Sequence, residues 1–433
     1  MIKNKVAKNA VWIIGCRIVQ AVLALAINML TARYFGPGNF GLINYAASIV
    51  AFVAPIMKLG INNVLVNEII KYPDKEGETL GTSLLLTLFS SFVCIVGIVC
   101  FVSVVNPGET DTLIVCSLYS LLLIFQSMEM IQYWFQAKYL SKYTSITILV
   151  AYGVVSAYKI FLLATEKNIY WFAISNAFDY CLIAVGLLIL YRAKGGQSLS
   201  FSFLAVKRLL AQGKHYIIPE LMIAVFAQTD KIMLKLMGEN DTVGYYSAAV
   251  SIAGLTAFVF TAIIDSMRPM ILERKKEGSS KYEKGISLLY SMVIYLALAQ
   301  SVFIAFLANP IIYILYGKSY MEAVDPLKII IWYTAFSYIG AVRNVWILAE
   351  EKQRYLWIIN LCGASANVLL NFVMIPVWGI NGAAAASLIT QIFTNVVVGF
   401  IMKPIRKNNL IMMEGLNPKF VIHQLKQFRR GTR

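Results

Sequence analysis

The chain has 433 residues, of which 59% are hydrophobic and only 14% are charged, and its formal net charge is +16. Soluble domains have about a quarter of their residues charged, so this composition excludes a soluble globular protein and indicates a membrane protein. The positive charge lies in short segments between apolar stretches and in the C-terminal segment. Membrane topology and attraction to anionic lipid explain it there, and we do not expect nucleic-acid binding.

A membrane-spanning helix needs about 20 predominantly apolar residues. Twelve stretches of the sequence meet this requirement and predict an all-α, multi-pass membrane protein. They are residues 11–32, 42–66, 80–102, 112–135, 146–165, 170–190, 217–237, 243–267, 286–307, 327–349, 356–375 and 383–402. The first stretch is too long for the apolar region of a cleaved signal peptide and lacks a small-residue cleavage site, so we expect it to stay in the protein as a signal anchor.

Lysine and arginine are distributed unevenly between the two sides of these stretches. If both termini are cytoplasmic, the inner segments hold 28 of the 38 basic residues. The outer side holds only Arg33, Lys167 and Lys318, and the other seven basic residues lie within the spans. This is the positive-inside pattern, and it predicts a cytoplasmic N-terminus and a cytoplasmic C-terminus.

The longest inner segment between neighbouring spans divides the chain into two six-helix halves. We predict an N-terminal half at 1–195, a linker at 196–215, a C-terminal half at 216–402 and a basic cytoplasmic tail at 403–433. GLINYAASI from Gly41 aligns with GYYSAAVSI from Gly244 at an offset of 203 residues, with four identities. Two halves of the same orientation indicate a parallel repeat about an axis along the membrane normal, with substrate bound in a central cavity between them.

Charged residues inside a membrane are costly and need a reason. Lys58 lies eight residues before the inner end of its span, and Pro55 just before it is a candidate for a helix kink. A hydrated cavity that attracts anions is one interpretation of Lys58, and a structural ion pair is the other. Arg17 and Arg343 lie nearer the inner surface, where each could reach the interface or line an inward-open vestibule.

The acidic residues at depth raise a different question. Asp179 lies near the middle of its span and must be protonated, paired or exposed to water. Proton coupling and pairing with a basic residue of a neighbouring helix are both open. Asp230 and Lys231 are adjacent in another span and do not face each other on a helix.

The remaining charges near span ends have simpler interpretations. Long side chains that reach the interface account for three lysines, and interfacial or pairing roles account for three acids. These residues are Lys159, Lys235 and Lys328, and Glu129, Glu220 and Asp265. The six cysteines all lie in apolar spans without metal-ligand spacing, and the two histidines are isolated, so we expect no metal site and no disulfide.

Four segments carry a resemblance to a known family. They are DKIMLKLMGENDTVGYYSAA from Asp230, TARYFGPGNFGLINYAASI from Thr31, MKLGINNVLVNEI from Met57 and PVWGINGAAAASLITQ from Pro376. With the twelve spans they make nearly the whole chain similar to the Wzx-type O-antigen and polysaccharide repeat-unit flippases. These form the polysaccharide transport branch of the multidrug/oligosaccharidyl-lipid/polysaccharide exporter superfamily.

The resemblance implies a transporter of the bacterial cytoplasmic (inner) membrane that is not an enzyme and has no cofactor. It would move an undecaprenyl-pyrophosphate-linked oligosaccharide from the inner to the outer leaflet by alternating access, in the synthesis of lipopolysaccharide O-antigen or a related surface polysaccharide. A polysaccharide polymerase and a chain-length regulator are candidate partners.

The resemblance also ranks the candidate site residues. By motif position, Lys58 beside LGINN and Lys231 in DKIML match the basic residues taken to meet the anionic head group, and Arg17 and Arg343 join them by depth. Coupling to protons or sodium would use Asp179 or Asp230. A cation-coupled multidrug antiporter of the same fold is the alternative function. A membrane-embedded glycosyltransferase or polymerase is a third, although no loop is large enough for its catalytic residues.

Overall fold

The computed structural model describes the backbone of residues 2–417 and the side-chain surroundings of residues 15, 16 and 18–417. Every regular element in the described chain is a helix, which confirms the all-α class. The chain forms two compact units, Met1–Gly244 and Tyr245–Arg433.

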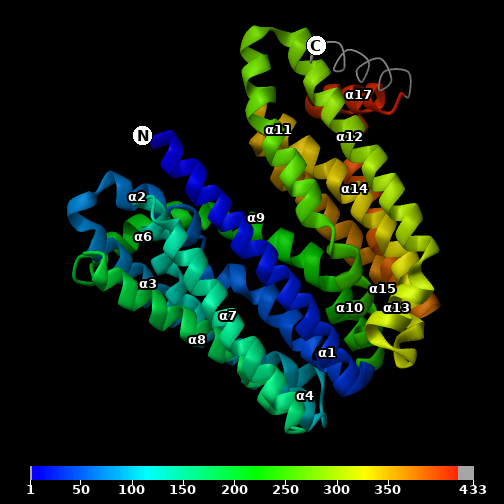
Figure 1. Ribbon diagram of the computed structural model, residues 1–433, viewed down its shortest axis with the longest axis horizontal. Coiled ribbons are helices and arrows are strands. Elements are labelled where there is room, and N and C mark those ends of the chain that lie inside the picture. The colour runs from blue at the N-terminus through cyan, green and yellow to red at the C-terminus, as the bar shows by residue number, and fades with distance from the viewer. Residues whose placement is uncertain (1, 418–433) are drawn as a thin grey trace. The chain divides into compact units, whose positions relative to one another are not determined.

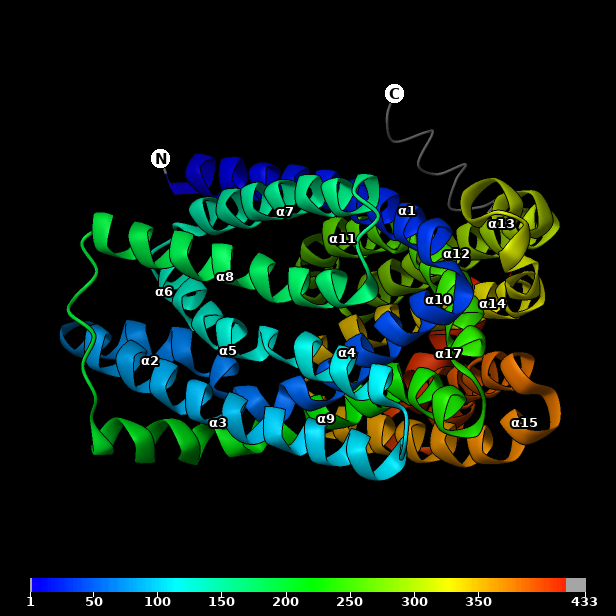
Figure 2. The same ribbon diagram turned by 90° about the horizontal axis from the view of Figure 1, so that it is seen from below.

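The first unit is built around a long N-terminal helix. Its elements are α1 (Ile2–Lys58), η1 (Ile61–Asn63), α2 (Leu65–Lys71), η2 (Pro73–Lys75), α3 (Glu76–Val105), α4 (Thr110–Ser120), α5 (Leu122–Gln126), η3 (Ser127–Met130), α6 (Ile131–Ala137), α7 (Ser141–Ala164), α8 (Ile169–Ala193), α9 (Phe203–Met237) and the start of α10 (Asn240–Gly254). Helix α1 packs against α7 and α9, and α8 packs against α4, α5 and α7. Figures 1 and 2 show α7 beside α1 and α8.

The side chains of this unit are arranged as expected for a bilayer. Trp134 packs edge-on against Phe135 and Tyr191 in the interior. On the outside of α3, Phe89 is 72% exposed and Val104 is 77% exposed. Exposed apolar side chains along a long helix are stable against hydrocarbon, so this face of α3 fits a lipid-facing surface.

The second unit is also helical throughout. It continues α10 and contains α11 (Ala257–Glu277), α12 (Ser279–Phe306), α13 (Ala308–Tyr316), η4 (Lys318–Ala323), α14 (Val324–Ala349), η5 (Gln353–Tyr355), α15 (Leu356–Ile392), the π-helical turn η6 (Phe393–Val397), α16 (Val398–Ile401), η7 (Lys403–Ile405) and α17 (Arg406–Gly415). Helix α14 packs between α12 and α15, and α17 packs on α12. Tyr290 of α12 donates a 3.0 Å hydrogen bond to Asn408 of α17.

Eight helical stretches of the described chain are long and apolar enough to cross a membrane. One of them, Ile18–Lys58, has 41 residues and would be about 60 Å long if straight, twice the hydrocarbon thickness. It bends at Gly36, and α15 bends at Gly379, both with positive φ. Each bent helix covers two of the expected spans. Helices α9 and α14, which carry charged residues, cover two more of the expected spans but are not among the eight. The number of twelve spans therefore stays a prediction, as does the cytoplasmic location of the termini.

The boundary between the compact units follows Gly244, whereas the linker between the halves was expected at 196–215. The reason for the difference is that the linker and α9 are fixed to α2 and α3. Gln197 accepts a 3.1 Å hydrogen bond from the backbone N–H of Gly77, and the N–H of Ser202 donates to Thr82 at 3.0 Å. Contacts between helices therefore group α9 with the first unit. The division into two six-helix halves remains a prediction about the repeat.

The two aligned glycines, Gly41 and Gly244, lie against each other. A Cβ atom on Gly41 would lie 2.7 Å from the nitrogen of Gly244 and 1.8 Å from the carbonyl oxygen of Asn240. A Cβ on Gly244 would lie 2.1 Å from the carbonyl oxygen of Pro37. In the offset of 203 residues, Pro37 corresponds to Asn240 and Gly41 to Gly244, so the contact is reciprocal. Reciprocal pairing is what a two-fold relation requires, and it supports the repeat.

Candidate functional site

Lys58 is the last residue of α1, three residues after Pro55. Helix α1 runs through Pro55, and the backbone break recorded inside it is at Gly36. The ammonium nitrogen of Lys58 lies 3.9 Å from a carboxylate oxygen of Glu129, and the two side chains are 23% and 17% exposed. The structure therefore contains a pair at the long limit of an ion pair, with both partners in partial contact with the surroundings. A role for Lys58 in head-group binding stays a prediction.

The LGINN segment after Lys58 holds α9 in place. Asn62 and Asn63 donate hydrogen bonds of 2.8 and 2.7 Å to the same carboxylate oxygen of Glu220. Glu220 was expected to be interfacial or a pair partner, and these amides are its partners. This motif thus has a structural role, which its residue pattern alone does not indicate.

The next residues of the same motif add a second attachment to α9. Glu68 of α2 is buried and lies 2.5 Å from the guanidinium of Arg208, and it accepts a 2.8 Å hydrogen bond from Gln212. Both partners lie on the first turns of α9. Of the two ion pairs in this segment, the pair of Lys58 with Glu129 is therefore the longer and weaker one.

Asp179 lies on α8 and faces a lysine of α7. Lys159 acts on it electrostatically and donates a 3.0 Å hydrogen bond to Asn176. Within the described residues, the Oδ1 atom of Asp179 is buried and has no hydrogen-bond partner. Lys159 was assigned to the interface, but its side chain is held between two helices by Asn176. Asp179 therefore has the basic neighbour that one interpretation required, and a carboxylate oxygen that remains able to bind a proton or a cation.

The other candidates fall in separate places. Asp230 on α9 is buried at 7% exposure, and the half-buried Lys231 interacts with it electrostatically. The side chain of Arg17 lies outside the described residues. Arg343 belongs to the second unit, where it is buried and donates a 2.7 Å hydrogen bond to the carbonyl of Thr394 in the π-helical turn. Its surroundings are those of a residue that fastens α14 to η6.

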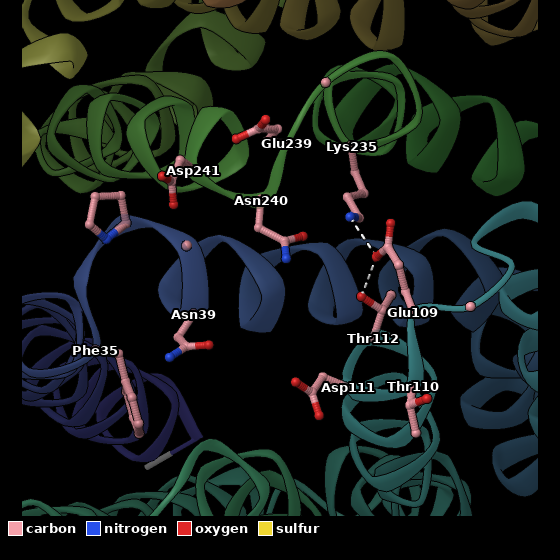
Figure 3. A pocket seen from close by; sticks show the side chains of 14 residues that line it. Phe35, Asn39, Glu109, Thr110, Asp111, Thr112, Lys235, Glu239, Asn240 and Asp241 are labelled. Atoms are coloured by element: carbon pink, nitrogen blue, oxygen red, sulfur yellow. Dashed lines mark hydrogen bonds and ion pairs between the residues drawn. The ribbon is translucent and has the colours of Figure 1, made fainter.

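An open cavity of about 820 Å³ lies beside the bend of α1, and we call it the bend pocket. Three segments of the first unit line it, at the bend, at the start of α4 and between α9 and α10. The lining residues are Phe35, Pro37, Gly38, Asn39, Gly108, Glu109, Thr110, Asp111, Thr112, Lys235, Gly238, Glu239, Asn240 and Asp241. Figure 3 shows Asn39, Asp111 and Asn240 in the space between these segments.

One wall of the bend pocket is fixed by an ion pair. Lys235, whose side chain is 5% exposed, lies 2.7 Å from a carboxylate oxygen of Glu109, and Thr112 donates a 2.6 Å hydrogen bond to the same oxygen (Figure 3). Burial raises the pKa of Glu109, but the hydrogen bonds from Lys235 and Thr112 outweigh it and leave that pKa below its ordinary value of 4.5. Lys235 was expected to reach the interface, and the structure shows its buried side chain paired with the partly exposed Glu109.

The remaining charges of the bend pocket are acidic. Asp111 accepts a 2.5 Å hydrogen bond from Tyr170, and Glu239 and Asp241 lie on the opposite segment. In the described part of the chain no three acidic, histidine or cysteine side chains are arranged to hold a metal ion. The pocket could not be predicted from the sequence because its lining comes from three segments that lie far apart in the chain.

The model of a family described as polysaccharide biosynthesis protein matches residues 6–275. An uncharacterised membrane protein of Methanocaldococcus jannaschii is 26% identical over 59% of this chain, and the match spans only 52% of that protein. The capsular polysaccharide biosynthesis protein CapF of Staphylococcus aureus is 20% identical over 89% of this chain and 96% of its own length.

Solved structures of similar fold are transport proteins. The lipid II flippase MurJ in an inward closed conformation matches with a TM-score of 0.72 at 14% identity, over 95% of this chain and 92% of that one. An inward-facing multidrug resistance transporter of the MATE family, in the MOP superfamily, matches with a TM-score of 0.66 at 14% identity, over 91% and 96% of the two chains. These likenesses show that the chain has their fold.

Proposed function

Since the chain belongs to the polysaccharide biosynthesis protein family, we propose that it is a flippase for a lipid-linked precursor of a surface polysaccharide. Its substrate would be an oligosaccharide linked to undecaprenyl pyrophosphate, such as an O-antigen repeat unit, moved from the inner to the outer leaflet of a bacterial cytoplasmic membrane. The family match over residues 6–275 carries the proposal, and the fold shared with a lipid II flippase supports it.

The chemistry of the substrate explains why a protein is needed. A pyrophosphate and its sugars cannot enter hydrocarbon without replacement of their hydration. Lys58 offers a positive charge held by Glu129 at 3.9 Å, and an anion can replace a partner at that distance at small cost. Lys231 is the second candidate for this contact. Arg343 ranks below both because its guanidinium is buried and already bound to the carbonyl of Thr394.

Energy coupling is proposed at Asp179. Its buried Oδ1 atom has no hydrogen-bond partner among the described residues, so protonation or sodium binding would satisfy it. Lys159 nearby would sense the change because the two side chains interact electrostatically. Asp230, beside Lys231, is the second candidate.

Flipping can be tested with the purified full chain in proteoliposomes. A fluorescent undecaprenyl-pyrophosphate-linked oligosaccharide is placed in both leaflets, and a membrane-impermeant reductant is added outside. We expect about half of the fluorescence to be protected in protein-free liposomes and nearly all of it to become accessible when the protein is present. Equal protection with and without protein would contradict the proposal.

A cation-coupled multidrug antiporter is the alternative, and the likeness to a MATE transporter is the observation that favours it. Export of a cationic dye from everted vesicles, driven by a proton or sodium gradient, distinguishes the two functions. We expect no export, because the basic side chain of Lys58, held by Glu129 only at 3.9 Å, would repel a cation.

A further inference from the structure

We propose that the bend pocket is a binding site for the sugar part of the lipid-linked substrate, separate from the contact that Lys58 makes with its phosphates. This inference rests on the proposed function for the identity of the ligand. The chemistry of binding is argued from the pocket itself, so the sugar site and the flippase function can be tested separately.

The size and walls of the bend pocket suit a small organic ligand. Its volume of about 820 Å³ lies in the upper part of the range for such sites, about 300–1,000 Å³. Two of its walls are in backbone contact, since Asn240 lies against Gly41 and Pro37 against Gly244. Lys235 and Glu109 fix the third. Rigid walls give a site that exists before the ligand arrives, which reduces the cost of binding.

Charge excludes an anionic ligand. Among the described residues, the one lysine in the lining is paired with Glu109, and the carboxylates of Asp111, Glu239 and Asp241 remain. A pyrophosphate would be repelled by these carboxylates. A metal ion is also disfavoured, since the carboxylates of the described chain form no three-ligand cluster. They lie on separate segments, an arrangement suited to a ligand with many spaced hydrogen-bond donors.

Sugars are such ligands. Their hydroxyl groups donate to carboxylates in charge-assisted hydrogen bonds, and amides such as those of Asn39 and Asn240 can both donate and accept. The Oδ1 atom of Asn240 is shielded from solvent and receives no hydrogen bond from the described residues, so it is an acceptor that a sugar hydroxyl can satisfy.

An aromatic ring completes the set of groups. Phe35 lines the pocket and is held by edge-on contacts with Tyr34 and Phe172, each with ring centroids 4.8 Å apart. It offers the apolar C–H faces of a sugar ring a fixed surface. All three lining segments lie at the ends of spans that the charge pattern assigns to the outer side, so the site would receive the glycan at the end of its transfer.

Binding of soluble saccharides tests the site without any flipping. Ligand-detected NMR is recorded on the purified full chain in nanodiscs, with a panel of neutral, N-acetylated and amino disaccharides that carry no lipid or phosphate. We expect at least one to bind, and Asn240→Ala and Asp241→Asn each to raise its Kd by about tenfold, the loss typical of one hydrogen bond to a charged or buried group. Glu322→Gln, an exposed acid of the expected outer side that does not line the pocket, is the matched control and should leave the Kd unchanged.

Each other outcome overturns the inference. One is that none of the disaccharides binds, and another is that the wild type and both variants bind them equally. The third is that the variants lose binding of a cationic dye rather than binding of a sugar. Thermal unfolding of each variant excludes misfolding as the cause of lost binding. If the proteoliposomes flip the lipid-linked substrate but no disaccharide binds, the pocket proposal fails alone. If disaccharides bind but no flipping occurs, the flippase proposal fails alone.

Discussion

Two lysine–glutamate pairs of the first unit differ in almost every respect. Lys58 and Glu129 are 3.9 Å apart and both partly exposed, beside a motif that fastens α9 to η1. Lys235 and Glu109 are 2.7 Å apart, with the lysine buried and Thr112 bound to the same carboxylate. The first pair is loose enough for an anion to replace one partner, whereas the second holds a wall in place. A charge inside the membrane is therefore a better functional candidate when its own partner holds it weakly.

The largest effect on activity is expected when the basic group of the loose pair, Lys58–Glu129, is removed. Lys58→Ala should reduce flipping in proteoliposomes by tenfold or more, because the anionic head group loses its charge-assisted hydrogen bonds. Lys58→Arg should retain most activity. Lys71→Ala, an exposed lysine of the expected inner side, should behave as wild type. Full activity of Lys58→Ala would remove Lys58 from the site.

Breaking the tight pair should affect stability more than head-group binding. Lys235→Ala is expected to reduce the free energy of unfolding by about 1–3 kcal/mol, since a hydrogen bond between charged groups is lost and part of Glu109 is buried without its partner. The measurement is thermal unfolding in detergent. Lys328→Ala breaks the exposed pair with Asp325 and should cost less than about 1 kcal/mol. Equal losses in the two variants would show that the Lys235 pair is not structural.

Releasing the loose lysine should strengthen its binding of anions. In Glu129→Gln, pyrophosphate no longer competes with a carboxylate for Lys58, and we expect about fivefold tighter binding of inorganic pyrophosphate, equivalent to about 1 kcal/mol. Glu109→Gln is the matched variant in the tight pair and should leave pyrophosphate binding unchanged. Weaker binding in Glu129→Gln would indicate that Glu129 positions Lys58 rather than competing for it.

The smallest expected effect is the pH dependence of the stability that the tight pair, Lys235–Glu109, contributes. The pKa of Glu109 is lowered in the folded chain, so its stabilising contribution is complete above its unfolded value of 4.5 and is lost as the pH falls through the lower folded pKa. The difference in melting temperature between wild type and Lys235→Ala should stay constant above pH 4.5 and shrink below it. A difference that persists at lower pH would mean that Lys235 stabilises the fold by packing alone.

The sequence predicted the fold class because long apolar helices are specified locally by composition. It also predicted which charges need a partner, but not which partner each would find. Glu220 and the asparagines of LGINN are about 160 residues apart, and Lys235 and Glu109 come from segments that approach only in the folded chain. The bend pocket escaped notice for the same reason. Interactions along a helix can be derived from spacing, whereas those between helices depend on tertiary packing.

The glycine contact has a consequence for how such a chain can arise. Gly41 touches the residue that corresponds to itself, Gly244, and the neighbouring contacts exchange equivalent partners. A surface that meets its own equivalent in this way is self-complementary, as in a two-fold homodimer. One half expressed as a separate gene product would thus already carry the central contact needed to pair with a second copy. Around that contact Pro37 differs from Asn240 and Gly38 from Asp241, so side chains can diverge after a gene duplication while the backbone crossing keeps both glycines.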